Sequence, residues 1–480
     1  MVTKYFAILF CVITTVAFSQ IDSQTDSLIV QTDSIVIDSV TVIEQETNCI
    51  TNPNALTPIF EKLYTLEQEK KGKINIVHIG DSHIQADIFS DVIRVNLQSE
   101  FGNGGFGFSF PYRLAKTNGS TSVRFKSNIE WEHRRNVYPP EKGIEVGLSG
   151  IALNTKEDFV IETEVRDTAY NFNTIKLITP YNLPLFDLAT SSKDIIIESK
   201  EPKVVSHKIK SGEALSVIAQ KYNTSVSAIK QANDMRSNTI YAGKVLKIPT
   251  GEMEKKTISR SEFIPLQLEA DSLSYYYHSQ ERLSKIYILP TKSVSPYELN
   301  GVVLENDTPG IIYHGIGVNG AKAIDYNKYP LFFKQLPVLQ PDLIIVSLGT
   351  NESFEKIETD KFITELNTFI TNIKIANPNA CVLVMTPPPS LFKKRYPNTF
   401  AGSYSSAILQ QESETYYASW DLFTEMGGLY SVPDNAKKGL MSTDRIHYSV
   451  QGYVLQGERF IESFNKAYNN FKLMKEDAVD

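Results

Sequence analysis

The chain has 480 residues, so we expect more than one domain and a substantial hydrophobic core. Its formal net charge of -7 argues against a nucleic-acid partner. Aromatic residues make up 11% of the chain, which suits carbohydrate-facing surfaces and β-sandwich cores equally well.

The first 19 residues have the pattern of a secretion signal peptide. Lys4 supplies a positive charge, and Phe6 to Phe18 is apolar but too short for a permanent membrane anchor. Ala17 and Ser19 precede an expected cleavage ahead of Gln20. We therefore expect an exported protein, periplasmic or associated with the cell wall, that has no membrane span after the signal is removed.

Residues 20–52 repeat Asp-Ser with Ile and Val, a composition typical of an acidic, disordered or extended linker. Signal removal leaves only Cys49 and Cys381. A disulfide is compatible with an oxidising compartment, but separate thiols are the favoured arrangement. Two cysteines make neither a disulfide scaffold nor, by themselves, a zinc site. We expect no metal and no cofactor.

Residues 53–115 open an α/β region. Helical spacing covers Leu56–Lys70, and the β-branched run Ile74–Ile79 ends in Gly-Asp-Ser at 80–82. An amphipathic helix follows over residues 86–98. A buried strand that breaks at a small turn before a helix holds a hydroxyl at the carboxyl end of a sheet. Ser82 is therefore the candidate nucleophile.

Residues 116–204 and 251–308 show short alternating strands, separated by Asn, Asp, Gly and Pro, with no long helical pattern. This pattern predicts one β-sandwich inserted in two parts. The expected strands are Val123–Lys126, Phe159–Thr163, Thr174–Ile178, Ile195–Glu198, Phe263–Leu268, Lys285–Leu289 and Gly301–Leu304.

Residues 205–250 interrupt this insert with a strand, two short helices and a closing strand. The landmarks, in order, are Gly212, Ile218-Ala219, Tyr222, Asn233, Ile240, Gly243, Leu246 and Ile248-Pro249. Together they resemble the LysM domain over its whole length. LysM domains bind glycans that contain N-acetylglucosamine, such as peptidoglycan or chitin, so the resemblance implies a partner of that kind. It implies glycan-binding residues at Gly212, Glu213, Ala214, Leu215, Asn238 and Ile240.

This module departs from the LysM pattern at Ala214, where a small hydroxyl residue is usual, and at Glu213, which replaces Asp. One side-chain hydrogen bond to sugar is thereby put in doubt. The module contains seven Lys and Arg residues against two acidic residues. Such a balance suits an anionic wall polymer or simply a solvated helix face. Lys- and Ser-containing stretches flank the module, so we expect it to be tethered.

The α/β pattern resumes over residues 309–474. We expect strands at Ile311–Tyr313, Leu343–Leu348, Val382–Met385 and Leu429–Val432, and helices carrying Leu331–Leu339, Phe362–Ile373, Gln411–Glu425 and Val450–Phe464. Apolar strands that alternate with amphipathic helices predict a three-layer, doubly wound, mostly parallel sheet. Its ligand site lies beyond the carboxyl ends of the strands, where Ser82, Gly320, Asn351 and residues 444–447 meet.

These residues have the chemistry that acyl transfer needs. Ser82 is a nucleophile, His447 a base, and Asp444, three residues earlier, can orient that base. Gly320 can bring a bare backbone N–H close to the substrate, and Asn351 can offer an amide N–H at a strand end.

The segments GDSH at 80–83, VNGA with Gly320, GTNE at 349–352 and DRIH at 444–447 resemble the four blocks of the SGNH, or GDSL-type, esterase superfamily. The resemblance covers about half of the mature chain. It implies a triad of Ser82, Asp444 and His447, with an oxyanion hole formed by Ser82, Gly320 and Asn351. Glu352 and His83 depart from the usual pattern. The GDSH form looks most like bacterial peptidoglycan O-acetylesterases, which also carry a β-sandwich between the first two blocks.

Other residues near these blocks have more ordinary interpretations. His78 is expected in the core, His83 in a structural or rim position, and His314 in a structural role near the site. His133, His207 and His278 are expected at the surface. Gly315 and Gly317 compete with Gly320 for the role of donor.

The sequence thus favours an exported serine esterase that removes O-acetyl groups from muramic acid in peptidoglycan through an acetyl-serine intermediate. The LysM module would hold it on the wall. The first alternative is an esterase or acyltransferase acting on another acetylated polysaccharide. The second is a non-catalytic peptidoglycan-binding protein.

Overall fold

The computed structural model describes residues 48–197, 200–255, 258–292, 296–415 and 417–477. The predicted signal peptide and residues 20–47 of the predicted linker lie outside this part of the chain. The end of that linker belongs to the fold, so the linker prediction is wrong there. Strand β1 (Ile50–Thr51) pairs with β24 (Ala418–Trp420), and the Trp420 indole donates to Asn48 Oδ1 at 3.0 Å. Burial of Ile50 and of this hydrogen bond fixes the segment.

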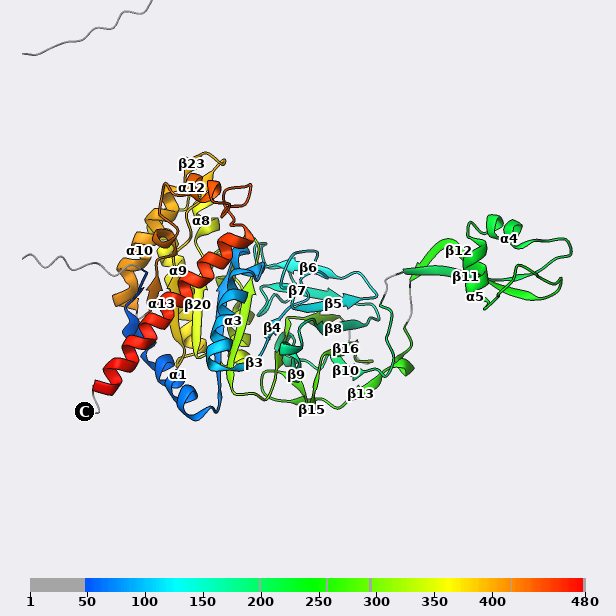
Figure 1. The fold of residues 1–480 in the computed structure, drawn as a ribbon, viewed down its shortest axis with the longest axis horizontal. Coiled ribbons are helices and arrows are strands. Elements are labelled where there is room, and N and C mark those ends of the chain that lie inside the picture. Colours follow the sequence, from blue (N-terminus) through cyan, green and yellow to red (C-terminus); the bar gives the residue numbers. More distant parts are fainter. Residues whose placement is uncertain (1–47, 198–199, 256–257, 293–295, 416, 478–480) are drawn as a thin grey trace, which may run out of the picture. The chain divides into compact units, whose positions relative to one another are not determined.

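A seven-stranded sheet is the centre of the α/β region, in the order β1-β24-β21-β20-β2-β19-β3. Figure 1 labels two of its strands, β20 and β3. All neighbouring strands pair in parallel except β1 with β24. The remaining strands are β2 (Lys73–Gly80), β3 (Asn103–Gly105), β19 (Gly310–Gly317), β20 (Leu343–Ser347) and β21 (Cys381–Met385). The predicted mostly parallel sheet with helices is therefore confirmed.

Helices cover both faces of this sheet. One face packs with α1 (Thr57–Glu69), α3 (Phe89–Phe101) and α13 (Val450–Asp477) in one hydrophobic cluster. The opposite face packs with α6 (Ala323–Asn327), α7 (Pro330–Gln335), α9 (Thr359–Ala376) and α10 (Thr399–Thr415). Alternate strand residues divide between the two clusters, as the period of two in a strand requires. Shorter helices are α2 (Ser82–Gln85), α8 (Thr350–Phe354), α11 (Leu422–Glu425) and α12 (Val432–Lys437).

Two predictions near the C-terminal end of the sheet are wrong. The expected helix Gln411–Glu425 is divided, because β24 lies between α10 and α11. The expected strand Leu429–Val432 is a turn that leads into α12. Gly427 and Gly428 before it have positive φ, Tyr430 is 76% exposed, and buried Val432 is already the first residue of α12, so the segment turns where a strand was expected.

The inserted region contains two five-stranded antiparallel sheets, ordered β13-β10-β16-β8-β5 and β14-β15-β9-β18-β4, and a three-stranded sheet, β17-β7-β6. Apolar residues of both larger sheets lie in one cluster, which continues into one face of the parallel sheet. The strands are β4 (Gly107–Ser109), β5 (Val123–Ser127), β6 (Glu132–Arg135), β7 (Ile151–Thr155), β8 (Ile161–Val165), β9 (Phe172–Ile178), β10 (Phe186–Thr190), β13 (Ile264–Leu266), β14 (Glu269–Ala270), β15 (Tyr275–Leu283), β16 (Lys285–Pro290), β17 (Tyr297–Leu299) and β18 (Gly301–Glu305).

One predicted strand of this region, Ile195–Glu198, is wrong. Residues 195–197 form no strand, and residue 198 lies outside the described residues. Ile195 is instead buried against Tyr287 and Phe263 in a small hydrophobic cluster, so its apolar character reflects burial in irregular backbone.

Residues 200–255 form a separate small unit with its own core. Strand β11 (Lys200–Lys208) pairs antiparallel with β12 (Val245–Lys255), and helices α4 (Leu215–Lys221) and α5 (Val226–Ala232) lie between them in the chain. The paired strands extend beyond the module predicted from sequence, to Lys200 opposite Lys255. Part of each flank predicted as a tether is therefore strand.

Within the described chain Cys49 and Cys381 are not joined by a disulfide, as the favoured sequence interpretation has them. Cys381 is buried at the start of β21, and burial raises the pKa of its thiol. Among the helices of the described ranges, none combines the length and apolar character needed to cross a membrane.

Candidate active site

Ser82 lies where β2 meets α2, at the carboxyl end of the central sheet. Gly80 ends the strand, and a Cβ there would lie 2.4 Å from Ile84 and 2.7 Å from the Ser347 carbonyl oxygen, so only glycine permits so close a turn. Asp81 then caps the short helix by accepting a hydrogen bond from the His83 N–H at 2.9 Å. The strand, the glycine and the cap together fix the Ser82 backbone.

Three side chains form a hydrogen-bonded chain at this edge. Ser82 Oγ lies 2.8 Å from His447 Nε2, and His447 Nδ1 lies 2.7 Å from Asp444 Oδ2. With its Nδ1 hydrogen donated to the carboxylate, the imidazole presents an Nε2 lone pair to the serine hydroxyl. The arrangement can remove a proton from Ser82 as its oxygen attacks a carbonyl carbon.

The turn before His447 holds Asp444 in the ionised form. Its Oδ1 accepts the backbone N–H groups of Ile446 and His447, both at 2.9 Å, while Arg445 takes a left-handed conformation. Burial opposes ionisation of this carboxyl, but the His447 ring and the two N–H donors outweigh it and lower its pKa. A carboxylate in this position stabilises the imidazolium that forms during proton transfer.

Gly320 and Asn351 face the same open pocket of about 540 Å³ as Ser82 and His447. Gly320 has a φ of +85°, a left-handed conformation that favours glycine. The competing glycines lie within β19 instead. A Cβ at Gly317 would stand 2.1 Å from the Gln85 backbone nitrogen, so that glycine serves close packing.

Asn351, the second residue of α8, already has acceptors for its amide hydrogens. Its Nδ2 donates to the Ala321 carbonyl oxygen at 2.9 Å and to Asp81 Oδ2 at 3.2 Å. An oxyanion in the pocket would therefore share or replace the longer of these bonds. The Asn351 amide lies at the wall of the pocket. Its N–H group is hydrogen-bonded to the carboxyl of Asp81, the residue before Ser82.

Two buried carboxyl groups, Asp81 and Glu352, contact the segments that carry the oxyanion candidates Gly320 and Asn351. Burial raises the pKa of Asp81 to about 7, against the opposing effects of the His83 N–H and His447. Burial likewise raises the pKa of Glu352 to about 8. Glu352 accepts the N–H groups of Ala323 at 2.8 Å and Gly349 at 3.1 Å, and so ties the loop after β19 to the loop after β20.

The buried histidines are separate from the proton-transfer chain. His78 bonds to Tyr313 and Ser347 in the core, as predicted. His83 bonds to the Tyr453 hydroxyl at 2.8 Å, and its ring centroid lies 5.2 Å from that of His447. Burial lowers the pKa of both His78 and His83 to about 3. His83 is therefore a neutral structural neighbour of His447.

Of the three histidines predicted at the surface, two are exposed and one is buried. His133 and His278 are exposed, as predicted. His207 is only 5% exposed, and its surface prediction is wrong, because it bonds to Tyr222 and Glu213 inside the small module. His314 is buried and structural, since its Nδ1 accepts the Phe108 N–H at 3.0 Å.

Several pocket residues were not identified from the sequence. Asn118, Asn319 and Tyr453 all line the pocket. Gln85 links two of them, because its Oε1 accepts the Asn319 N–H at 2.6 Å and its Nε2 donates to the Asn118 carbonyl oxygen at 2.6 Å. A glutamine three residues after the candidate nucleophile was the one available signal, whereas Asn118 lies in a segment assigned to the insert.

In the small module, the six predicted glycan-binding residues do not share one environment. Gly212, Ala214 and Asn238 are exposed, whereas Leu215 is in the module core and Ile240 packs against it. The Glu213 carboxylate accepts the Lys210 N–H at 2.7 Å and bonds to His207 at 2.9 Å. Glu213 and Leu215 therefore hold the loop in place, and the exposed residues are the ones that can reach a glycan.

A largely parallel sheet with helices on both faces and a linked serine, histidine and aspartate at its carboxyl edge defines a serine-type hydrolase site. Residues 298–455 match the GDSL-like Lipase/Acylhydrolase family, and residues 207–249 match the LysM domain. The chain therefore carries a GDSL-like acylhydrolase domain and a LysM domain.

A solved structure described as a peptidoglycan O-acetylesterase in action has the same fold. Its match has a TM-score of 0.57 at 19% identity and covers 88% of this chain and 98% of that one. The chain is also 50% identical over 42 residues to the probable autolysin SsaALP of Staphylococcus aureus (strain NCTC 8325 / PS 47), and 49% identical over 43 residues to the probable peptidoglycan endopeptidase LytE of Bacillus subtilis (strain 168). These matches cover 9% of this chain and only 16% and 13% of the relatives.

Proposed function

We propose that this protein is an exported serine esterase that removes O-acetyl groups from muramic acid residues of peptidoglycan. The observation that carries the proposal is the chain of hydrogen bonds from Ser82 through His447 to Asp444, with 2.8 and 2.7 Å between the bonded atoms. The open pocket beside it admits a bulky alcohol portion of an ester rather than enclosing a small one.

In the proposed reaction, Ser82 Oγ attacks the acetyl carbonyl carbon and its proton passes to His447 Nε2. The backbone N–H groups of Ser82 and Gly320 and the Asn351 amide stabilise the oxyanion, and each such donor contributes about 3 kcal/mol to transition-state stabilisation. The C–O bond to the sugar then breaks, and His447 returns the proton to the sugar oxygen. Water activated by the same histidine cleaves the acetyl-serine bond, which releases acetate and restores Ser82.

The LysM domain supports the choice of cell wall as substrate. By holding the chain on an insoluble polymer, it raises the concentration of acetyl esters near Ser82 without taking part in bond cleavage. The shared fold with a peptidoglycan O-acetylesterase and the short matches to wall-lytic relatives agree with this choice. Export, by the signal at residues 1–19, would bring the protein to the wall.

The proposed domain division follows from the same function. Residues 53–115 and 309–474 form the hydrolase, residues 116–204 and 251–308 form a β-sandwich insert, and residues 205–250 form the LysM module. The β-sandwich continues the hydrophobic core of the hydrolase, so we assign it to the enzyme body.

The test is acetate release by the full-length chain from O-acetylated peptidoglycan and, in parallel, from acetylated xylan. We expect release from peptidoglycan to be the faster. Ser82→Ala should abolish it, since loss of a serine nucleophile costs a factor on the order of 10⁶ in kcat. Ser406→Ala, at an exposed serine of α10, is the matched control and should keep full activity. Undiminished release by Ser82→Ala, or none by the wild type, would overturn the proposal.

A further inference from the structure

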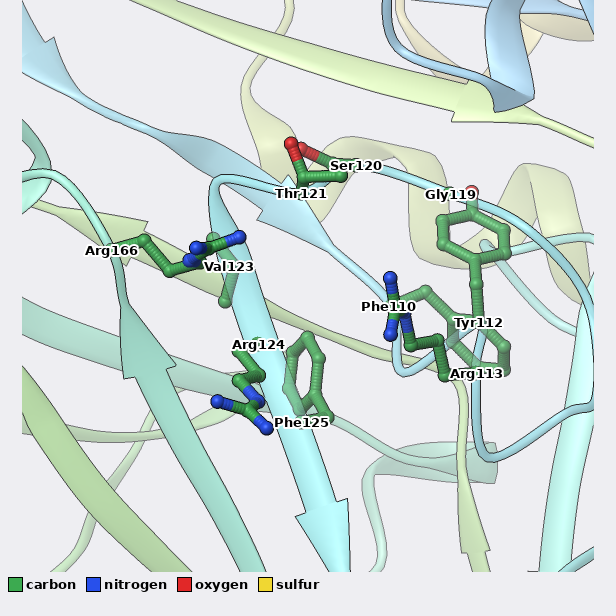
Figure 2. A pocket seen from close by; sticks show the side chains of 10 residues that line it. All are labelled: Phe110, Tyr112, Arg113, Gly119, Ser120, Thr121, Val123, Arg124, Phe125 and Arg166. Atoms are coloured by element: carbon green, nitrogen blue, oxygen red, sulfur yellow. The ribbon is translucent and has the colours of Figure 1, made fainter.

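A second pocket, of about 270 Å³, lies between the segment 110–121 and strand β5. Three arginines, Arg113, Arg124 and Arg166, line it, and Figure 2 shows their side chains around the start of β5. They come from three separate stretches of chain, which the fold brings together.

The guanidinium groups of this pocket are not engaged by neighbouring carboxylates. Within the described residues, none of the three forms an ion pair or a side-chain hydrogen bond. Glu164, directly across from Arg124 in the β5–β8 ladder, faces Lys285 at 3.4 Å instead. Asp167, next to Arg166, accepts a hydrogen bond from the Ala169 N–H at 2.9 Å.

Two of the arginines lie on the same face of the sheet. The Arg166 N–H donates to the Ser122 carbonyl oxygen, which puts Arg166 diagonally across the ladder from Arg124 and on the same face of the sheet. Diagonal neighbours lie within reach of long side chains, so the two guanidinium groups can approach the same ligand. One anion can therefore contact both.

The arginine side chains also favour a particular kind of anion. Guanidinium groups match carboxylates in shape and can donate two parallel hydrogen bonds to one.

This pocket is joined to the catalytic pocket by consecutive residues. Asn118 lines the catalytic pocket, and Gly119, the next residue, lines the arginine pocket. Asn319, beside Gly320, donates to Asn118 Oδ1 at 2.7 Å. A Cβ at Gly119 would lie 2.3 Å from the Tyr112 ring, so glycine lets the chain pass against it. One fixed loop therefore forms a wall of both pockets.

We propose that the arginine pocket is a subsite for a carboxylate carried by the same glycan whose acetyl ester lies at Ser82. The peptide stems attached to muramic acid supply such carboxylates close to the sugar. This proposal rests on the proposed function. It specifies which part of the substrate the arginine pocket recognises. It makes the enzyme prefer acetylated glycan that still bears its anionic peptides.

The test compares soluble O-acetylated muramoyl peptides with the same fragments after their carboxylates are converted to methylamides. For the full-length wild type we expect about a tenfold higher kcat/KM on the carboxylate form, mainly through KM. Arg124→Gln/Arg166→Gln should remove that preference and leave kcat/KM on the methylamides and on 4-nitrophenyl acetate unchanged. Arg282→Gln, at an exposed arginine on β15, is the matched control and should keep the preference.

A binding arm separates this proposal from the proposed function. Titration of the Ser82→Ala chain with the deacetylated fragments should show weaker binding of the carboxylate form when Arg124 and Arg166 are replaced. Because the LysM module is unchanged, the difference reports the pocket alone. The subsite is overturned if the replacements weaken both forms equally or neither, or if glycerol phosphate binds to the arginines and the fragments do not. Absence of acetate release with intact arginine-dependent binding would instead overturn only the esterase.

Discussion

Asn351 donates its amide to Asp81, the residue immediately before Ser82, across 3.2 Å. One oxyanion candidate is therefore oriented by a carboxyl on the nucleophile's own turn. Asp81→Asn keeps an oxygen for the His83 N–H but alters the acceptor for Asn351. We expect kcat to fall by about 10- to 100-fold with little change in KM, since donors cost 10²–10³ when removed outright. Steady-state kinetics on a soluble acetyl ester measures this.

A double-mutant cycle gives the control for Asp81. If Asp81 acts through Asn351, its replacement should cost little more once Asn351→Ala is present. Additive losses in the double variant would show that Asp81 acts on Ser82 or on the fold, and would contradict the positioning role.

The contact between Asp444 and His447 makes a second prediction. Asp444→Asn should lower kcat by a factor on the order of 10³–10⁴, because the amide no longer stabilises the required tautomer and the imidazolium. Asp434→Asn is the matched control: Asp434 is an exposed residue of α12 that bonds to Lys437 and does not line the pocket. Similar activity losses in both variants would refute a specific role for Asp444.

The buried histidines predict an acid-dependent loss of stability. Burial lowers the pKa of His314 to about 3, as for His78 and His83, so the folded chain stays unprotonated where the unfolded chain binds protons. The free energy of unfolding is then highest above pH 6.5 with respect to these groups and falls as the pH drops towards 3.

His314→Gln isolates one of these groups. It should reduce the slope of unfolding free energy against pH, between pH 6 and 4, by about 1.4 kcal/mol per pH unit. Urea unfolding at several pH values gives this slope. Asp81 and Glu352, whose pKa values burial raises, act in the opposite direction, but they are unchanged in the comparison. An unaltered slope would mean that His314 is protonated in the folded chain.

The LysM module allows a fourth prediction. Glu213 needs only an acceptor oxygen for Lys210 and His207, so Glu213→Gln should leave binding to insoluble peptidoglycan within about twofold of the wild type. Asn238→Ala removes an exposed amide from the predicted groove and should weaken binding more. A sedimentation assay with the full chain distinguishes them, and the reverse order would assign sugar contact to Glu213.

Much of the hydrolase could be predicted, because its strands are apolar runs that end abruptly in Gly-Asp-Ser or Gly-Thr-Asn. Parallel strands have their carboxyl ends at one edge of the sheet, and this rule predicts that Ser82 and His447, far apart in the chain, come together there. The three-residue strand β24 was missed, since so short a segment has no periodicity. Strand β15 was missed because its residues are largely polar or half-exposed.

The site was less predictable where it depends on loops. Sequence order placed Asn118 in the insert, yet its backbone bond to Gln85 makes it a wall of the catalytic pocket. The internal role of Glu213 was likewise hidden, because a loop carboxylate ordinarily faces solvent. Only the buried partner His207 reverses that expectation.

The pairing of β2 with β19 also constrains the order in which the chain can fold during synthesis. These adjacent parallel strands are separated by about 230 residues of chain. Closing so long a loop costs about 2 kcal/mol more than closing one of 30 residues, unless the intervening segment folds first and brings its ends together. His447, the partner of Ser82, follows it by 365 residues. Hydrolytic activity should therefore arise only after synthesis has passed His447, and chains that stop before it should be inert towards esters.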